Sequence, residues 1–194
     1  MVSRLYCKTC HYPYSTCVCD AVIPLYSPVP IAIIQHPHEA RHAKNTCRLL
    51  QLGLYNIQVN RAASTFDDKL TELCTIGRPA LFFPTAQSVD FDANHQRFMK
   101  NRPSHLLFID ATWRKAKKLW HSNPVLHTIP QWHLSPAYSS RYHIRKSSFS
   151  SSLSTLEAVS HVLKKGYSVD TSPLLNLFSV MQQRTQRYAT NDVQ

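Results

Sequence analysis

Four of the six cysteines in this 194-residue chain lie within thirteen residues, as Cys7-Lys-Thr-Cys10 and Cys17-Val-Cys19. The C-x2-C-x6-C-x-C spacing lets short loops turn four thiolates toward one point, which suits a tetrahedral Zn2+ ion. Because four protein ligands leave no open position for water, we interpret such a site as structural. Two small disulfides or four incidental thiols are the alternatives, and zinc is favoured because structural disulfides are rare in the cytosol.

A second candidate site lies within residues 106–120, LLFIDATWRKAKKLW. An apolar run stops at Asp110, and Thr112 and Trp113 stand where a basic helix should begin. Asp110 or Thr112 could simply be the N-cap of that helix, with the tryptophans on its buried face. Alternatively, the free N–H groups at the helix start would attract a carboxylate or phosphate, and Asp110 would orient an amine or accept a proton. Both interpretations remain open at this point.

Two further apolar runs end in residues that can bind or react, namely His36-Pro-His38-Glu39 and Phe83-Pro84-Thr85-Ala86. In open parallel sheets, ligands bind beyond the carboxyl ends of the strands, so we expect both segments to lie close to Asp110. The three glycines of the chain, Gly53, Gly77 and Gly166, lie far apart in the sequence. Neither G-x-G-x-x-G nor G-x4-G-K-[ST] can occur, which excludes a Rossmann dinucleotide site and a P-loop.

The elements that must position these residues follow from apolar periodicity. Short apolar runs predict strands at residues 30–36, 56–59, 80–84, 105–109 and 132–134, and helical periodicity predicts helices at 38–52, 88–101 and 112–121. Capping-box spacings predict two more helices: one opens at Thr65 with Asp68 and is closed by Gly77, and the other runs from Ser154 with Glu157 to Lys165, with Gly166 as its stop. Ser172-Pro173 opens a last helix to about residue 188. Alternating strands and helices predict an α/β fold with a mainly parallel sheet and flanking helices, preceded by a zinc-binding segment at residues 1–22.

The composition limits what the chain can bind. Lys and Arg number 22 against 11 Asp and Glu, a net charge of +11, so we expect a polyanionic partner such as nucleic acid or an anionic membrane surface. No apolar run approaches the roughly 20 residues of a membrane-spanning helix, and the first residues lack the apolar stretch of a signal peptide. We therefore expect a soluble cytoplasmic protein, in which the isolated Cys47 and Cys74 are small core residues.

The Asp110-Ala-Thr-Trp113 segment resembles the D-x-T-W signature of the DTW-domain family. The resemblance covers nearly the whole chain, because the cysteine cluster, Gln35–Glu39, Phe83-Pro84, Tyr142–Lys146 and Ser154–Ala158 also match in order. Since that family resembles the SPOUT superfamily in fold, the resemblance implies that residues 23–194 form a SPOUT-like catalytic domain with a trefoil knot at its cofactor site. It also implies transfer of the 3-amino-3-carboxypropyl group of S-adenosylmethionine to N3 of a tRNA uridine, with release of 5′-methylthioadenosine.

The same resemblance implies roles for particular residues. Asp110, Thr112 and Trp113 would be catalytic, with Asp110 either accepting the uridine proton or orienting the substrate, and with Glu39 and His36 as the next candidates for the base. The residues expected to bind S-adenosylmethionine are Phe83, Pro84, Thr85, Asp110, Thr112, Trp113, Ile129, Pro130, Leu153, Ser154 and Thr155. Glu157 is interpreted as a capping-box carboxylate in preference to a ligand contact.

Basic residues near these segments are expected to contact tRNA phosphates. They are Arg114, Lys115, Lys117, Lys118, Arg141, Arg145 and Lys146, with Arg41 and Lys44 as weaker candidates.

Two other functions stay open. A SPOUT-type RNA methyltransferase would use the same cofactor and expose a different carbon, and a noncatalytic zinc-containing RNA-binding module would account for the charge and the cysteines alone. Affinity for S-adenosylmethionine separates the second from an enzyme. The target uridine and the oligomeric state do not follow from the sequence.

Overall fold

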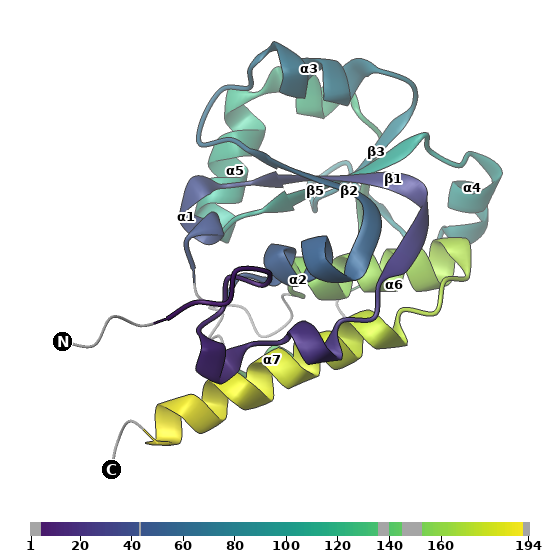
Figure 1. The fold of residues 1–194 in the computed structure, drawn as a ribbon. Coiled ribbons are helices and arrows are strands. Elements are labelled where there is room, and N and C mark those ends of the chain that lie inside the picture. Colours follow the sequence, from purple (N-terminus) through teal and green to yellow (C-terminus); the bar gives the residue numbers. More distant parts are fainter. Residues whose placement is uncertain (1–4, 43, 136–139, 145–152, 192–194) are drawn as a thin grey trace.

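The computed structural model describes residues 5–42, 44–135, 140–144 and 153–191. Residues 188–191 are described by their backbone only. Within these residues a six-stranded sheet lies between two layers of helices (Figure 1). Every neighbouring pair of strands is parallel, in the order β2-β1-β5-β3-β6-β4. This arrangement confirms the predicted α/β fold.

The strands follow the apolar runs of the sequence. They are β1 (Leu25–Gln35), β2 (Leu54–Arg61), β3 (Pro79–Phe82), β4 (Val89–Asp90), β5 (His105–Asp110) and β6 (Gln131–His133). β1 begins five residues earlier than predicted, because its prolines Pro28 and Pro30 fall where the pairing with β2 is irregular, between Tyr26 and Ile31. A proline that lacks an N–H group is tolerated at such an irregularity.

The helices are α1 (Pro37–Ala40), α2 (Thr46–Gly53), α3 (Asp68–Thr75), α4 (His95–Lys100), α5 (Trp113–Ser122), α6 (Thr155–Tyr167) and α7 (Ser172–Asn191), with 3-10 turns at η1 (Tyr14–Thr16), η2 (Cys19–Ala21) and η3 (Pro124–Thr128). The single helix predicted at 38–52 is wrong, because the Asn45 side chain accepts a hydrogen bond from the Cys47 N–H and starts α2 as a new helix. The helix predicted at 88–101 is also too long, since its first residues form β4.

Two predicted helix ends are also corrected. Asp67, not Thr65, caps α3, because its carboxylate accepts from the Leu70 N–H at 2.9 Å. α6 runs through Gly166 and ends at Tyr167, where Ser168 takes the left-handed conformation. Gly166 instead gives room to two aromatic rings, since a β-carbon there would lie 3.3 Å from Phe98 and 3.4 Å from Phe91.

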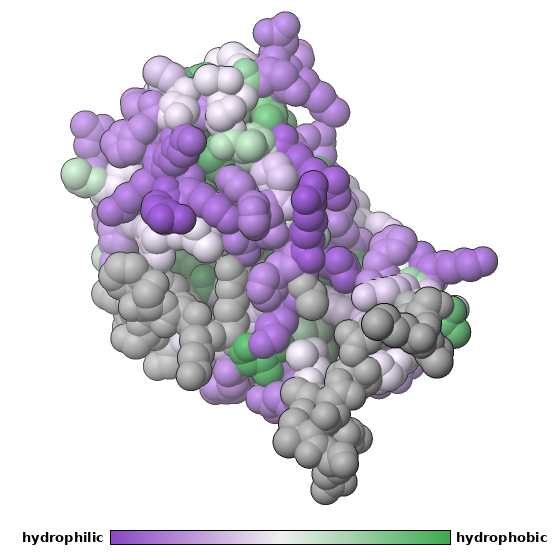
Figure 2. Space-filling model, turned by 90° about the vertical axis from the view of Figure 1, so that its left-hand side faces the viewer, coloured by the Kyte–Doolittle hydropathy of each residue, from purple (hydrophilic) through white to green (hydrophobic). Residues whose placement is uncertain are grey.

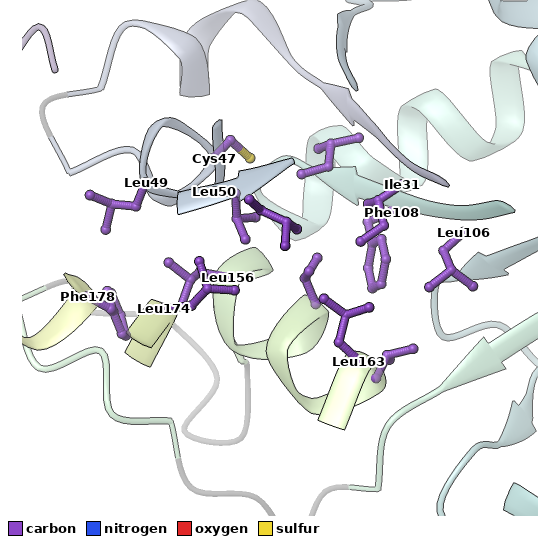
Figure 3. Close-up of a cluster of buried hydrophobic side chains, with 14 of the residues drawn as sticks. Ile31, Cys47, Leu49, Leu50, Leu106, Phe108, Leu156, Leu163, Leu174 and Phe178 are labelled. Carbon is purple, nitrogen blue, oxygen red and sulfur yellow. The ribbon is translucent and has the colours of Figure 1, made fainter. Parts of the chain in front are cut away.

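Alternate residues of the central strands face two separate hydrophobic layers. Ile31, Leu106 and Phe108 point toward α2, α6 and α7, as Figure 3 shows, whereas Ile34 and Leu107 pack against α3, α5 and η3 on the other face. Continuous burial on both faces explains why these strands are apolar at nearly every position.

The N-terminal segment packs against the far end of the chain. The Arg184 guanidinium of α7 donates two hydrogen bonds of 2.7 Å to the Asp20 carboxylate and a third to the Cys17 carbonyl. The Arg48 guanidinium of α2 lies 4.9 Å from the centre of the Tyr12 ring. The division of the chain at residue 22 stays a prediction. The contacts show that the N-terminal segment packs against α2 and α7.

Two further expectations concern topology and membranes. The trefoil knot stays a prediction, because residues 136–139 and 145–152, between β6 and α6, lie outside the described residues. No helix in the described part of the chain combines the length and apolar character needed to cross a bilayer.

Candidate active site

The predicted strand ends meet at one edge of the sheet. β1 and β5 stay in register up to Gln35 and Asp110, and the His36 N–H then donates to the Asp110 carbonyl at 3.0 Å. β3 lies on the other side of β5, so Phe83–Thr85 leave the sheet beside Asp110. The expectation that these segments lie together is confirmed. Figure 2 faces this carboxyl edge, whose coloured surface is mostly hydrophilic.

The Asp110 carboxylate is buried and both of its oxygens accept hydrogen bonds. Oδ1 accepts from the Thr155 hydroxyl at 2.6 Å, and Oδ2 accepts from the Gln35 amide at 2.8 Å. Thr112 occupies the N-cap position of α5, with no capping hydrogen bond from its side chain. The interpretation of Asp110 as a helix cap is therefore wrong, and its carboxylate instead joins β5, β1 and α6.

The residues behind Asp110 form a buried polar layer. Asn45 Oδ1 accepts from the Gln35 amide at 3.1 Å and from the Cys47 N–H at 2.9 Å. Burial, and then the Asp110 charge, raise the pKa of the Cys47 thiol well above its ordinary value, so this side chain stays protonated. Cys47 is thus a core residue as predicted, but it also lies beside the carboxylate.

Aromatic rings line the same edge on the face of the sheet that α5 covers, opposite the face covered by α2 and α6. Trp113 lies 6.0 Å from Phe83 between ring centres, and Trp120 lies 5.7 Å from Phe83. Trp113 is half-buried, whereas Phe83 and Ile129 are core residues of the layer under α5. Among the predicted cofactor residues, Phe83 and Ile129 would therefore shape the site from behind.

The remaining predicted cofactor residues lie nearby. The Thr85 hydroxyl donates to Gln131 Oε1 at 2.5 Å, which ties the end of β3 to β6. Pro84 and Pro130 are exposed, and Leu153 and Ser154 are half-buried before α6.

Glu157 forms the predicted capping box and does more. Its carboxylate accepts from the Ser154 N–H at 2.8 Å, while the Ser154 hydroxyl caps α6. It also accepts from the Ser140 hydroxyl at 2.8 Å and the Arg141 N–H at 2.6 Å. Gln182 of α7 holds the same stretch, by accepting from the His143 N–H at 2.8 Å. Glu157 therefore fixes residues 140–141 against the start of α6.

The predicted RNA-contacting residues divide into three groups. Arg114, Lys117 and Lys118 are exposed on α5, Lys115 is half-buried, and Arg141 is exposed beside α6. Arg145 and Lys146 lie outside the described residues. Of the weaker candidates, Arg41 is exposed, but the Lys44 ammonium donates to the Ile144 carbonyl.

The alternative bases are placed differently from Asp110. His36 Nδ1 accepts from the His38 N–H at 3.2 Å, so it caps α1. Burial and the Lys115 charge lower the pKa of His36, which favours its neutral form. Glu39 is buried within α1.

The four clustered cysteines converge as their spacing predicts. Their sulfur atoms all lie within 4.8 Å of one another, with Cys7–Cys19 and Cys10–Cys17 at 3.6 Å. An ion about 2.3 Å from four tetrahedral sulfurs would separate them by about 3.8 Å, so the geometry fits Zn2+. All six cysteines are free in this structure, and the four clustered sulfurs face one shared point instead of forming two bonded pairs. Backbone N–H groups of Cys10 and Thr9 lower the pKa of Cys7 to about 6, whereas burial and the neighbouring thiols raise the pKa of Cys19.

Comparison with known proteins decides the family. A model of the DTW domain matches residues 4–186. The chain belongs to the DTW-domain family. The family's signature aspartate in this chain is thus the buried Asp110, and its tryptophan is the half-buried Trp113.

Curated relatives of this DTW-domain chain carry related names. The tRNA-uridine aminocarboxypropyltransferase 2 of Macaca fascicularis is 30% identical over 179 residues, or 85% of this chain and 59% of that protein. The protein of the same name from Drosophila melanogaster is 31% identical over 166 residues, or 81% and 64%. The tRNA-uridine aminocarboxypropyltransferase A of Arabidopsis thaliana is 29% identical over 140 residues, or 63% and 53%.

The chain therefore spans between 53% and 64% of the length of these relatives. No solved structure matches it significantly.

The partners of Asp110 in this DTW-domain chain do not follow from the predicted elements. The resemblance includes Gln35 only as part of Gln35–Glu39, and the helix predicted at 38–52 encloses Asn45. The one sequence signal for Gln35 is that it is a polar residue at the end of an otherwise apolar strand. Asn45 could have been found as a helix-capping residue.

Proposed function

We propose that this protein transfers the 3-amino-3-carboxypropyl group of S-adenosylmethionine to N3 of a tRNA uridine. The observation that carries the proposal is the Asp110 carboxylate, which is buried at the carboxyl edge and engaged by Gln35 and Thr155 instead of capping α5. The names of the relatives support the reaction class. We further propose that the protein acts on tRNA in the cytoplasm.

In the proposed reaction the uridine N3 attacks the arm carbon that is bonded to sulfur. The carbon–sulfur bond breaks, its electron pair stays on sulfur, and neutral 5′-methylthioadenosine leaves while N3 loses its proton. A sulfonium makes all three attached carbons electrophilic, so the site selects the product by which carbon it presents to the nucleophile.

The proposed role of Asp110 follows from its remaining hydrogen-bonding capacity. A carboxylate has about four acceptor positions, and the side chains of Thr155, Gln35 and Cys47 engage three of them. The remaining position would accept from the ammonium group of the arm or take the N3 proton. The carboxylate of the arm would lie at the start of α5, near the Thr112 hydroxyl and the Trp113 N–H, where the helix dipole favours negative charge.

The adenosine would lie on the side of the site formed by loops. Pro84, Thr85, Pro130, Leu153 and Ser154 would contact it directly, and Phe83 and Ile129 would support this wall from the core. The proposed tRNA contacts are the exposed cations of α5 and Arg141, together with Arg145 and Lys146.

Zinc would have a structural role at the N-terminal segment. Cys7, Cys10, Cys17 and Cys19 would hold it, and the bound ion would supply folding energy to a segment too short to fold alone.

The decisive experiment is mass spectrometry of tRNA nucleosides after incubation with the protein and S-adenosylmethionine. We expect 3-(3-amino-3-carboxypropyl)uridine together with 5′-methylthioadenosine. A methylated nucleoside with S-adenosylhomocysteine would replace this function by the methyltransferase alternative. No affinity for S-adenosylmethionine would leave an RNA-binding module.

The role of Asp110 is tested by substitution in the same assay. Asp110→Ala should lower transfer by about 100-fold or more while tRNA affinity is kept, because the carboxylate acts on the reacting end of the substrate. The exposed Asp170→Asn is a matched control that should be fully active. Asp110→Asn keeps the shape and removes the charge, so an active Asp110→Asn variant would mean that Asp110 orients the arm and is no base.

A further inference from the structure

We propose that Gln35 is a positioning residue that fixes the Asp110 carboxylate for the reaction. This inference rests on the proposed function in so far as Asp110 handles the substrate. Gln35 is the last residue of β1, is 3% exposed and pairs in register with Asp110 on β5. Its side chain therefore reaches Asp110 from the neighbouring strand, within the sheet itself.

The orientation of the Gln35 amide follows from its neighbours. Asn45 Oδ1 accepts from the Cys47 N–H, and a backbone N–H can meet only an oxygen, so the oxygen of Asn45 faces Gln35. Asp110 Oδ2 is an acceptor as well. The group between these two oxygens must donate to both, and only the amide nitrogen, with its two hydrogens, can do so.

Gln35 thereby links two helix starts to the carboxylate. Hydrogen bonds run from the N-cap of α2 through Asn45 and Gln35 to Asp110, and on to Thr155, the first residue of α6. The Thr155 hydroxyl can rotate, whereas a planar amide held at both hydrogens cannot. Gln35 is therefore the partner that sets the plane of the Asp110 carboxyl group. Misplacing a reacting group by about 1 Å can lower a rate by about 100-fold.

The substitution Gln35→Glu tests this geometry, because it keeps the shape and replaces the donor with an acid. An introduced carboxyl group would face Asp110 and Asn45 Oδ1, and it could donate to either only while protonated. Cys47 of α2 is the other titratable neighbour of this position, and the charge of Glu39 on α1 acts on Cys47 as well. Thr155 and Asn45 carry no charge. Since its charged neighbours are negative and it is buried, the pKa of the introduced carboxyl should rise above about 4.3.

The sign of the pH dependence follows. A carboxyl group whose pKa is raised on folding stabilises the protein below its unfolded value, and this stability is lost as pH rises through the folded value. We expect the melting temperature of Gln35→Glu to fall below that of the wild type by an amount that grows between about pH 5 and pH 9. The matched control is Gln58→Glu, because Gln58 is exposed on β2 and its substitution adds the same charge. The difference in melting temperature between Gln58→Glu and the wild type should stay the same over this pH range.

The catalytic part of the test uses the transfer assay. We expect kcat of Gln35→Glu to fall as pH rises, with the KM for tRNA unchanged, and Gln35→Met to lose about 100-fold in kcat at every pH. Recovery of the kcat of Gln35→Glu at acid pH would show that this variant folds. The test therefore does not depend on Gln35→Met, which could lose activity by folding poorly.

Two outcomes would overturn the inference: a Gln35→Glu variant that behaves as Gln58→Glu does in both measurements, or a Gln35→Met variant with wild-type kcat. The melting profile needs no transferase activity. A wild-type protein that transfers nothing would therefore overturn the proposed function, while the melting profile alone still decides whether Gln35 holds Asp110.

Discussion

At the scale of single residues, buried or half-buried carboxylates each join several elements of this protein. Asp110 connects β5 with β1 and α6, and Glu157 connects α6 with residues 140–141. Asp92, which follows β4, accepts from the Lys165 ammonium at 2.6 Å and from His161 Nε2 at 2.9 Å, both on α6. Each carboxylate fixes the start or the side of α6, the helix that carries Thr155.

The contacts of Asp92 with Lys165 and His161 should stabilise the protein in a way that depends on pH. Burial alone would raise the pKa of Asp92, but hydrogen bonds from Lys165 and His161 outweigh it and lower the pKa from 3.8 to about 2. Because the folded value is the lower one, this stability is present above about pH 4 and is lost as pH falls toward 2. We expect Asp92→Asn to lower the free energy of unfolding by about 1–2 kcal/mol at pH 7, discounted for solvent screening, and to flatten its pH dependence below pH 4.

Denaturant titrations at several pH values measure this effect. Glu72→Gln is the control, since Glu72 is exposed on α3 and its substitution removes the same charge. Equal free energies of unfolding for the wild type and Asp92→Asn at pH 7 would contradict the prediction.

At the scale of elements, apolar runs place five of the strands, and their alternation with helices predicts a mainly parallel sheet but not the order of its strands. The breaks were harder to predict: Asn45 divides α1 from α2, and Val89–Asp90 forms a strand of two residues. These features depend on one side-chain hydrogen bond and on pairing with β6, neither of which periodicity reports. The edge of the sheet that carries the site was predictable because parallel strands share their carboxyl end. The partnership of Gln35 with Asp110 was not, because it depends on the register between β1 and β5.

The exposed face of α5 should bind tRNA phosphates. Lys117→Gln together with Lys118→Gln should weaken tRNA binding and reduce the slope of log affinity against log salt by about 1.4 to 1.8, because two contacts are lost. Filter binding over a range of salt concentrations measures the slope.

The matched control is Arg97→Gln together with Lys100→Gln on α4, which removes two exposed cations elsewhere on the molecule. Equal losses in both double variants would show a general charge effect and no specific role for α5.

At the scale of the whole molecule, the N-terminal segment is bound to the main fold at several points. Arg184 holds Asp20, and the Tyr12 hydroxyl donates at 3.3 Å to the backbone carbonyl of Asn45, whose side chain accepts from Gln35. Loss of the segment's structure would therefore remove a contact from the layer behind Asp110. The cysteine cluster and the carboxyl edge are therefore connected through Asn45.

Metal removal should consequently unfold the segment and lower the melting temperature. We expect one zinc ion per chain by elemental analysis, and we expect Cys17→Ser or a strong chelator to release it, since the ion supplies the folding energy of the segment. Cys74→Ser is the control for metal content, because Cys74 lies in α3 and is not part of the cluster. A wild-type protein without stoichiometric zinc, or one whose melting is unchanged by chelator, would contradict the prediction.

The docking of residues 5–22 on α7 has a consequence for the order of events during translation. Asp20 and Arg184 are separated by 164 positions, so the ribosome releases the cysteine cluster long before the helix that covers it. The four thiols lie close together in the chain and can capture an ion as soon as Cys19 emerges. Docking on α7 has to wait for that helix, and until then Val18, which lies between η1 and η2 and is buried in the finished fold, faces the solvent of the cell. We infer that in the nascent chain residues 5–22 can bind the ion while their apolar side is still uncovered. This side is a transient surface that a chaperone could recognise.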